Sequence, residues 1–175
     1  MHPRRHIPIP IALLANAILG LILIEANHYL SGFSLQAIIP ASFVLYAGLC
    51  MSYLPGLFVC IVSGLMMDAS IPTPPGYFLI TLPILQLVIH RLRPKLHREG
   101  GLDSILITQF LNLLVLLHLS FLYHQQAPIP LFLSFIQILT SQTLLLVILP
   151  THLAIQIALS SALGIDVNEE EAKSA

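Results

Sequence analysis

The sequence predicts an all-α integral membrane protein, a compact bundle of six transmembrane helices with both termini in the cytoplasm. Composition is the first reason. Hydrophobic residues make up 57% of the 175 residues and charged residues only 9%, against about 25% charged residues in a soluble domain. With so little polar material, lipid must cover much of the surface. A membrane domain of this length holds about six helices of roughly 20 residues each, together with their loops.

The distribution of lysine and arginine is the second reason. Two arginines precede the first apolar run, four basic residues share one loop and one lysine lies in the tail: Arg4, Arg5, Arg91, Arg93, Lys95, Arg98 and Lys173. Positive charge is retained on the cytoplasmic side in short loops. All these residues can share that side only if the chain crosses the membrane six times, because losing one crossing between Arg5 and Arg91 would separate the two clusters.

Apolar runs, separated by polar or proline-rich segments, define the six expected spans. The polar cluster 25–28 ends the first run, and Pro40 falls in the first turns of the second. Tyr53-Leu54-Pro55-Gly56 provides a tight turn before the third. The spans are expected at about Ile7–Ile24, Leu35–Tyr53, Pro55–Pro72, Gly76–Leu92, Ser104–Tyr123 and Leu131–Leu163.

The third and sixth expected spans are unusual, the third because it contains an aspartate and the sixth because of its length. Asp68 interrupts the third, which is retained because the charge distribution requires it; the proline-rich segment 70–76 then forms an outer connection. Residues 131–163 are too many for one upright span, so a single tilted helix kinked at Pro150 is expected. One transmembrane domain thus covers residues 1–163, and the acidic tail 164–175 is expected to be disordered.

Asp68 is the one strongly anomalous residue of the apolar runs. At ~1.5 Å per residue from Pro55 it lies roughly 20 Å into a hydrocarbon layer about 30 Å thick. A carboxylate at the centre of that layer costs about 2.5–3.5 kcal/mol, and less near its edge. Three interpretations remain open: a contact with a partner or ligand, a buried hydrogen bond at a helix end, and a carboxylate that reaches interfacial water and ends the span.

Small and polar residues recur at helical spacing in several spans. Gly56, Cys60 and Gly64 stand four residues apart, which lets helix backbones approach closely. Internal helix packing is expected there, with an intermolecular interface as the alternative. A polar stripe on the last two spans is expected to hydrogen-bond between helices or, alternatively, to line a ligand cavity: Thr108, Gln109, Asn112, Ser134, Gln137, Thr140 and Ser141.

The sequence carries no arrangement typical of an enzyme, a metal site or a nucleic-acid interface. It has no pair of intramembrane aspartates, no Gly-x-Ser-x-Gly and no His-Glu-x-x-His. Its eight histidines are scattered, apart from His2 and His6 near the N-terminus, whereas a metal needs ligands that converge. No catalytic residues, metal or cofactor are therefore expected, and the basic residues flank the membrane and do not form a stripe for nucleic acid.

The run Gly64-Leu65-Met66-Met67-Asp68, followed by Pro74 and Gly76, resembles a motif of the MreD family of rod-shape-determining membrane proteins. Members are about this length, have five or six spans and carry a Gly-x-x-x-Asp segment with Pro and Gly six and eight residues after the Asp. The chain departs from the family pattern in its additional Pro72 and Pro75 and in its acidic tail.

The resemblance implies a non-catalytic component of the cell-wall elongation machinery in the bacterial inner membrane. Its partners would be a bitopic MreC-like protein and, indirectly, MreB-like filaments and peptidoglycan synthases. Gly64, Asp68, Pro74 and Gly76 would then form a partner-contact or structural motif. The alternative is the substrate-binding membrane subunit of a vitamin-type transporter, because such six-span subunits have a similar size; that function needs a polar cavity that opens outward.

Overall fold

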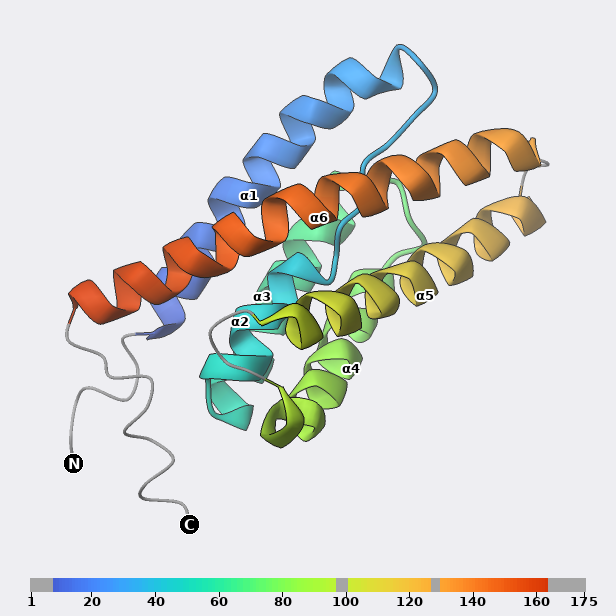
Figure 1. Cartoon of the computed structure of the whole chain (residues 1–175). Coiled ribbons are helices and arrows are strands. Elements are labelled where there is room, and N and C mark those ends of the chain that lie inside the picture. The colour runs from blue at the N-terminus through green and yellow to red at the C-terminus, as the bar shows by residue number, and fades with distance from the viewer. Residues whose placement is uncertain (1–7, 97–100, 127–129, 164–175) are drawn as a thin grey trace.

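The computed structural model of the chain describes residues 8–96, 101–126 and 130–163, and all regular structure within these ranges is helical. The acidic tail at 164–175 lies outside them, as do His2 and His6. The elements are α1 (Pro8–Ser31), α2 (Ser42–Cys50), α3 (Tyr53–Ser70), α4 (Tyr77–Leu92), the short 3-10 helix η2 (Arg93–Lys95), α5 (Leu102–Gln126) and α6 (Leu131–Ala162) (Figure 1).

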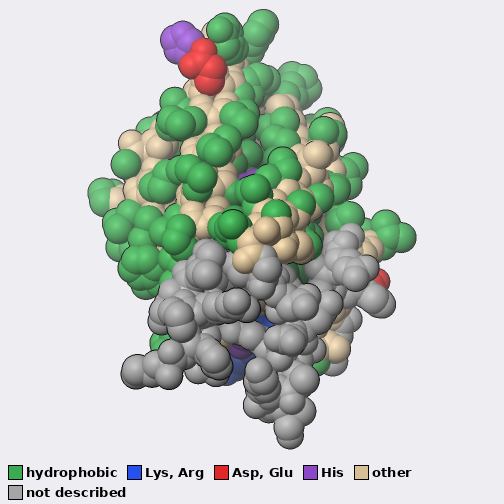
Figure 2. All heavy atoms as spheres, turned by 90° about the vertical axis from the view of Figure 1, so that its left-hand side faces the viewer, with side chains coloured by type: hydrophobic (Ala, Val, Ile, Leu, Met, Phe, Trp, Pro, Cys, Tyr) green, Lys and Arg blue, Asp and Glu red, His purple; other side chains and the backbone are tan. Residues whose placement is uncertain are grey.

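Four of the described helices, α1, α3, α5 and α6, are long and apolar enough to cross a membrane. The apolar α4 has 16 residues and covers only about 24 Å at ~1.5 Å per residue, less than the ~30 Å hydrocarbon layer. Large apolar side chains are exposed, and Figure 2 shows them over most of the described surface that faces the viewer. The predicted all-helical class is therefore confirmed, and the apolar surface is that of a membrane protein.

The second expected span is not the continuous helix that the sequence predicted. Residues 35–39 have no regular structure, residues 40–41 form a turn, and the helix α2 begins only at Ser42. Pro40 explains the break, because proline lacks a backbone N–H and also drives the preceding residue towards extended backbone. The prediction placed Pro40 inside the first turns of the helix, whereas the helix begins after it.

This irregular segment and α2 lie in the interior of the protein. Every residue from Ala37 to Met51 is buried. Their apolar side chains belong to one cluster with buried residues from α1, α3, α4, α5 and α6. Backbone that is neither helix nor barrel is tolerated at membrane depth only where protein surrounds it or water reaches it. Here protein surrounds it, so its polar backbone groups need partners from neighbouring helices.

The chain runs back and forth between two ends of the molecule. The beginning of α1, the α2–α3 junction and the last turns of α6 lie towards the lower left of Figure 1. The end of α1, the α3–α4 connection and the facing ends of α5 and α6 lie towards its upper right. The light-blue segment that follows α1 descends from the upper end to α2, so the broken second segment runs in the direction that a crossing requires.

Two further boundaries differ little from their predicted places. α3 begins at Tyr53, so the turn before it falls at Met51 and Ser52, and Pro55 occupies the first helical turn, where no backbone N–H is needed. α6 is a single helix of 32 residues that continues through Pro150. At ~1.5 Å per residue it is about 48 Å long, so it must tilt or extend beyond the hydrocarbon layer.

Candidate functional site

The four residues of the Gly64, Asp68, Pro74 and Gly76 motif lie together at the joint between α3 and α4. Gly64 and Asp68 are one turn apart on α3. Pro74 and Gly76 belong to the connection 71–76, which leads directly into α4. We refer to this region, the last two turns of α3 with the connection and the first turn of α4, as the α3–α4 joint.

Asp68 binds the N-terminus of α4 through both oxygens of its carboxylate. The backbone N–H of Phe78 donates to Oδ1 and that of Leu79 donates to Oδ2, each at 2.9 Å. Thr73 Oγ1 adds a longer bond of 3.4 Å to Oδ1. The first N–H groups of a helix have no partner within the helix, and an anion there also interacts favourably with the helix dipole. Asp68 therefore caps α4 from a neighbouring helix, in the manner of a local N-cap side chain.

The placement of Asp68 within its own helix supports this interpretation. Asp68 lies in the last turn of α3, where the negative end of the helix dipole disfavours a carboxylate. The residue that immediately precedes α4, Gly76, has no side chain to cap it. The carboxylate is thus unfavourable for the helix that carries it and favourable for the helix that follows.

Gly64 permits the close approach that this capping requires. A Cβ atom at this position would lie 2.7 Å from the carbonyl oxygen of Phe78 and 2.9 Å from Cα of Leu79. Both are backbone atoms of the first turn of α4, which cannot move aside as a flexible side chain could. Because Gly64 has no side chain, the first turn of α4 can pack directly against the backbone of α3. The N–H groups of that turn then lie within hydrogen-bond distance of the Asp68 carboxylate.

The connection itself closes with a tight turn that suits its prolines and glycine. The N–H of Tyr77 donates to the carbonyl oxygen of Pro74 at 3.0 Å, and Gly76 has φ 79° and ψ 7°. These angles match the third residue of a type II turn, in which proline favours the second position and glycine the third. Pro75, a departure from the family pattern, occupies that second position.

Gly56 and Cys60 continue the packing face of α3 towards the α2–α3 junction. A Cβ atom at Gly56 would lie 2.8 Å from the carbonyl oxygen of Ala47 in α2 and 3.0 Å from Nε2 of Gln86 in α4. Cys60 is fully buried. Within the described residues, this face of α3 is used for packing inside the protein, against α2 and α4.

Side chains from three helices satisfy the buried backbone of the broken segment. Asn27 of α1 accepts from the N–H of Ala37 at 2.6 Å and donates to its carbonyl oxygen at 3.0 Å. Ser141 Oγ of α6 accepts from the N–H of Ile38 at 3.1 Å. Asn112 Oδ1 of α5 accepts from the N–H of Ala41 at 3.4 Å. Part of the predicted polar stripe thus binds main chain, which the sequence alone could not indicate.

Gln109 of the same stripe joins α5 directly to α6 through Gln142. Gln109 Nε2 donates to the carbonyl oxygen of Gln142 at 3.2 Å, and Gln142 Nε2 donates to that of Gln109 at 3.3 Å. Thr108 Oγ1 donates to Ser104 of its own helix. Hydrogen bonds of this kind between helices typically stabilise membrane proteins by about 0.6 kcal/mol each.

A buried asparagine of α1, Asn16, joins four elements. Asn16 Nδ2 of α1 donates to the carbonyl oxygen of Phe43 in α2 at 3.0 Å and to Ser63 Oγ in α3 at 2.8 Å. Its Oδ1 accepts from His152 Nε2 and Gln156 Nε2 of α6, each at 3.2 Å. All four hydrogen-bonding positions of the amide are occupied. The signal available in the sequence was polar residues within apolar runs: Asn16 in the first, Ser63 in the third, and His152 and Gln156, four residues apart, in the last.

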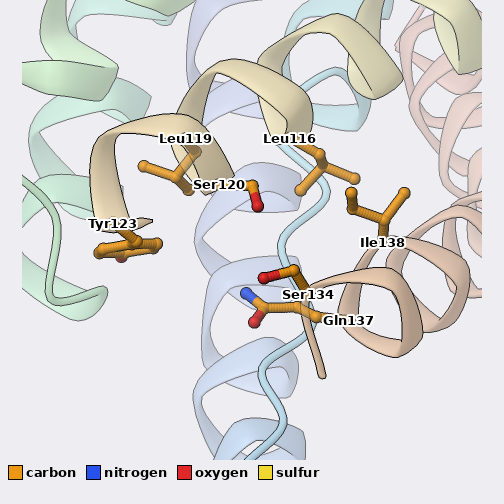
Figure 3. A pocket seen from close by; sticks show the side chains of 7 residues that line it. All are labelled: Leu116, Leu119, Ser120, Tyr123, Ser134, Gln137 and Ile138. Atoms are coloured by element: carbon orange, nitrogen blue, oxygen red, sulfur yellow. The ribbon is translucent and has the colours of Figure 1, made fainter. Parts of the chain in front are cut away.

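Two clefts open at the surface of the described helices. One lies among α1, α2 and α3, has mostly apolar walls and offers about 60 Å³ to water-sized molecules. The other lies between α5 and α6 near their facing ends and offers about 10 Å³ (Figure 3). Among the described residues no three His, Cys, Asp or Glu side chains converge on a point where a metal could bind.

Comparisons with protein-family models, with curated proteins and with solved structures find no match to this chain. The function of the protein is therefore inferred from its residues and their geometry.

Proposed function

We propose that this protein is a non-catalytic, multi-pass component of the bacterial inner membrane that acts in rod-shape determination, as its resemblance to the MreD family implies. The observation that supports this most is the α3–α4 joint. The residues that carry the resemblance, Gly64, Asp68, Pro74 and Gly76, all contribute to that one structure.

The proposal includes six crossings with both termini in the cytoplasm. The positive-inside distribution favours this arrangement. The broken second segment can just span the membrane: the five residues 35–39 at up to ~3.3 Å each, with the turn 40–41 and the nine residues of α2 at ~1.5 Å each, come to about 33 Å, against ~30 Å for the hydrocarbon layer. α4 is short, but η2 and the connection 71–76 extend it at both ends.

The mode of action that fits this architecture is contact through helix faces and short loops. The connections between the described helices are short, so a partner would meet mainly apolar, lipid-depth surface. A bitopic MreC-like protein offers a single helix for such a surface, and MreB-like filaments and peptidoglycan synthases would be reached indirectly. The α3–α4 joint supports this function by fixing the two helices, because Gly64 and Asp68 of α3 both contact the first turn of α4.

The transporter-subunit alternative draws less support from the same geometry. Pockets for small molecules have volumes of about 300–1,000 Å³ with convergent polar groups. The two clefts described above offer about 60 and 10 Å³. Two residues of the polar stripe that could line a substrate path, Asn112 and Ser141, bind the broken segment instead.

Depletion of the protein in its rod-shaped host tests the proposal. We expect the cells to become rounded as the protein is lost, because a missing scaffold component would uncouple wall synthesis from cell shape. Phase-contrast microscopy of depleted cells measures the ratio of cell length to width, and re-expression of the intact chain should restore it. Rods of normal shape after complete depletion, confirmed by immunoblot, would count against the proposed function.

A further inference from the structure

The facing ends of α5 and α6 leave three polar side chains without a hydrogen-bond partner among the described residues. Ser120 lies on α5, and Ser134 and Gln137 lie on the first turns of α6. Figure 3 shows their polar atoms turned towards the same gap between the two helices. Their half-buried position contrasts with that of Asn112 and Ser141 deeper in the seam, which bind the backbone of the broken segment.

The walls of this α5–α6 cleft restrict what could occupy it. Leu116, Leu119 and Ile138 form its apolar sides. Tyr123 closes another side and is held there, because its hydroxyl donates to the carbonyl oxygen of Pro72 at 2.7 Å. No charged side chain is among the described residues that line the cleft, so it suits a neutral group that donates or accepts hydrogen bonds. Its volume of about 10 Å³ is close to the space that one water-sized oxygen group requires.

The depth of the cleft indicates where that group comes from. Ser134 and Gln137 are three and six residues into α6, so they lie roughly 5 and 9 Å from its start at ~1.5 Å per residue. Since α5 ends at Gln126 and α6 begins at Leu131, the chain turns back here, and the first turns of α6 fall near the boundary between hydrocarbon and headgroups. The ester carbonyls of glycerolipids lie at that boundary, and so does the one free glycerol hydroxyl of a diacylglycerol.

The surface around the cleft is apolar and exposed, as a lipid-facing surface is. Phe121 on α5 and Leu131, Phe132 and Phe135 on α6 are each at least 60% exposed. A polar cleft inside such a surface matches an amphiphile, whose chains cover the apolar residues while one uncharged oxygen group enters the cleft.

We propose that the α5–α6 cleft binds the uncharged glycerol-ester region of a membrane lipid, through hydrogen bonds to Ser120, Ser134 and Gln137. The hydroxyls and the amide N–H groups donate to an ester carbonyl, and the hydroxyl and amide oxygens accept from a glycerol hydroxyl. This inference does not depend on the proposed role in cell shape.

Native mass spectrometry of the purified full chain, in detergent micelles that contain dioleoylglycerol, tests the proposal. We expect the wild-type protein to retain one lipid. The double variant Ser134→Ala/Gln137→Leu should retain it about tenfold less, because at least two hydrogen bonds are lost. Thr143→Val is the matched control: Thr143 is an exposed α6 residue whose hydroxyl donates to Leu139 of the same helix, so its loss should leave lipid retention unchanged. The dialkyl ether of glycerol, which lacks carbonyls, should bind more weakly than the ester if the carbonyl is recognised and equally well if the hydroxyl is.

Photolabelling of the wild-type protein with a diazirine-bearing diacylglycerol provides a second readout that does not depend on how the double variant folds. Labels concentrated within residues 116–138 would support the proposal. Equal lipid retention by the double variant, labels spread evenly over the helices, or a wild-type protein that retains no lipid and holds only water in the cleft would overturn it.

Discussion

Replacing Asp68 with alanine is expected to lower the free energy of unfolding by about 1–2 kcal/mol, the range for loss of an N-cap side chain. The substitution leaves the backbone N–H groups of Phe78 and Leu79 without the carboxylate that accepts them at 2.9 Å. It also removes the negative charge from the positive end of the α4 dipole. Asp68→Asn keeps one acceptor oxygen, so it should lower the free energy of unfolding by less than Asp68→Ala does. Reversible unfolding in mixed micelles of increasing SDS content measures these differences.

Glu25→Ala is the matched control for this prediction. Glu25 is an exposed carboxylate on α1, and it forms no hydrogen bond or ion pair with any residue that the structure describes. Its removal should change the unfolding free energy by less than about 0.5 kcal/mol. If Asp68→Ala proved as mild as Glu25→Ala, Asp68 would not cap α4, and a contact with a partner outside this chain would become the better interpretation.

Gly64→Ala is expected to destabilise the protein by about 1–3 kcal/mol, the usual cost of overpacking. The new methyl group would meet backbone atoms of Phe78 and Leu79 at 2.7 and 2.9 Å, so α4 would have to move away from α3. That movement would also lengthen the hydrogen bonds to Asp68. The measurement is again the unfolding free energy in SDS mixed micelles.

Gly20→Ala provides the matched comparison, because a Cβ atom at Gly20 of α1 would have no neighbouring heavy atom within 4 Å. Alanine favours helix over glycine by up to about 1 kcal/mol, so this variant should be unchanged or slightly more stable. Equal effects of the two substitutions would show that general helix propensity, and not the close approach at the joint, determines the outcome.

The elements that the sequence predicted well are those defined by local pattern. α3, α4, α5 and α6 appear near their expected bounds because long apolar runs and proline-rich connections are local features. α1 was predicted to end at about Ile24, but it continues through the polar cluster 25–28 to Ser31, about two turns further. The broken second segment was missed because its stability comes from distant residues. Ser141, which binds the N–H of Ile38, is 103 positions away in the chain. Because Ser141 and Asn112 bind its backbone, the irregular segment is stable without helical hydrogen bonds, and the helix α2 begins only after Pro40.

The candidate site follows the same division. The spacing of Gly64 and Asp68 identified the important residues of α3, but three roles for Asp68 stayed open because its partners belong to the next helix. The link between Asn16 and His152 joins residues 136 positions apart, and nothing local pairs them. A sequence places polar residues in apolar runs, but their partners are fixed only when the helices pack.

In the proposed topology the broken segment 35–50 is a true span, so that the chain crosses the membrane an even number of times before its basic loop. Reporter fusions at Thr73, compared with fusions at His124 and Lys95, test this most directly. The six-span topology predicts a periplasmic signal at Thr73 and His124 and a cytoplasmic signal at Lys95. A cytoplasmic signal at Thr73 would contradict it, because the chain would then cross an even number of times before Thr73, and either the segment 35–50 or α3 would not be a span.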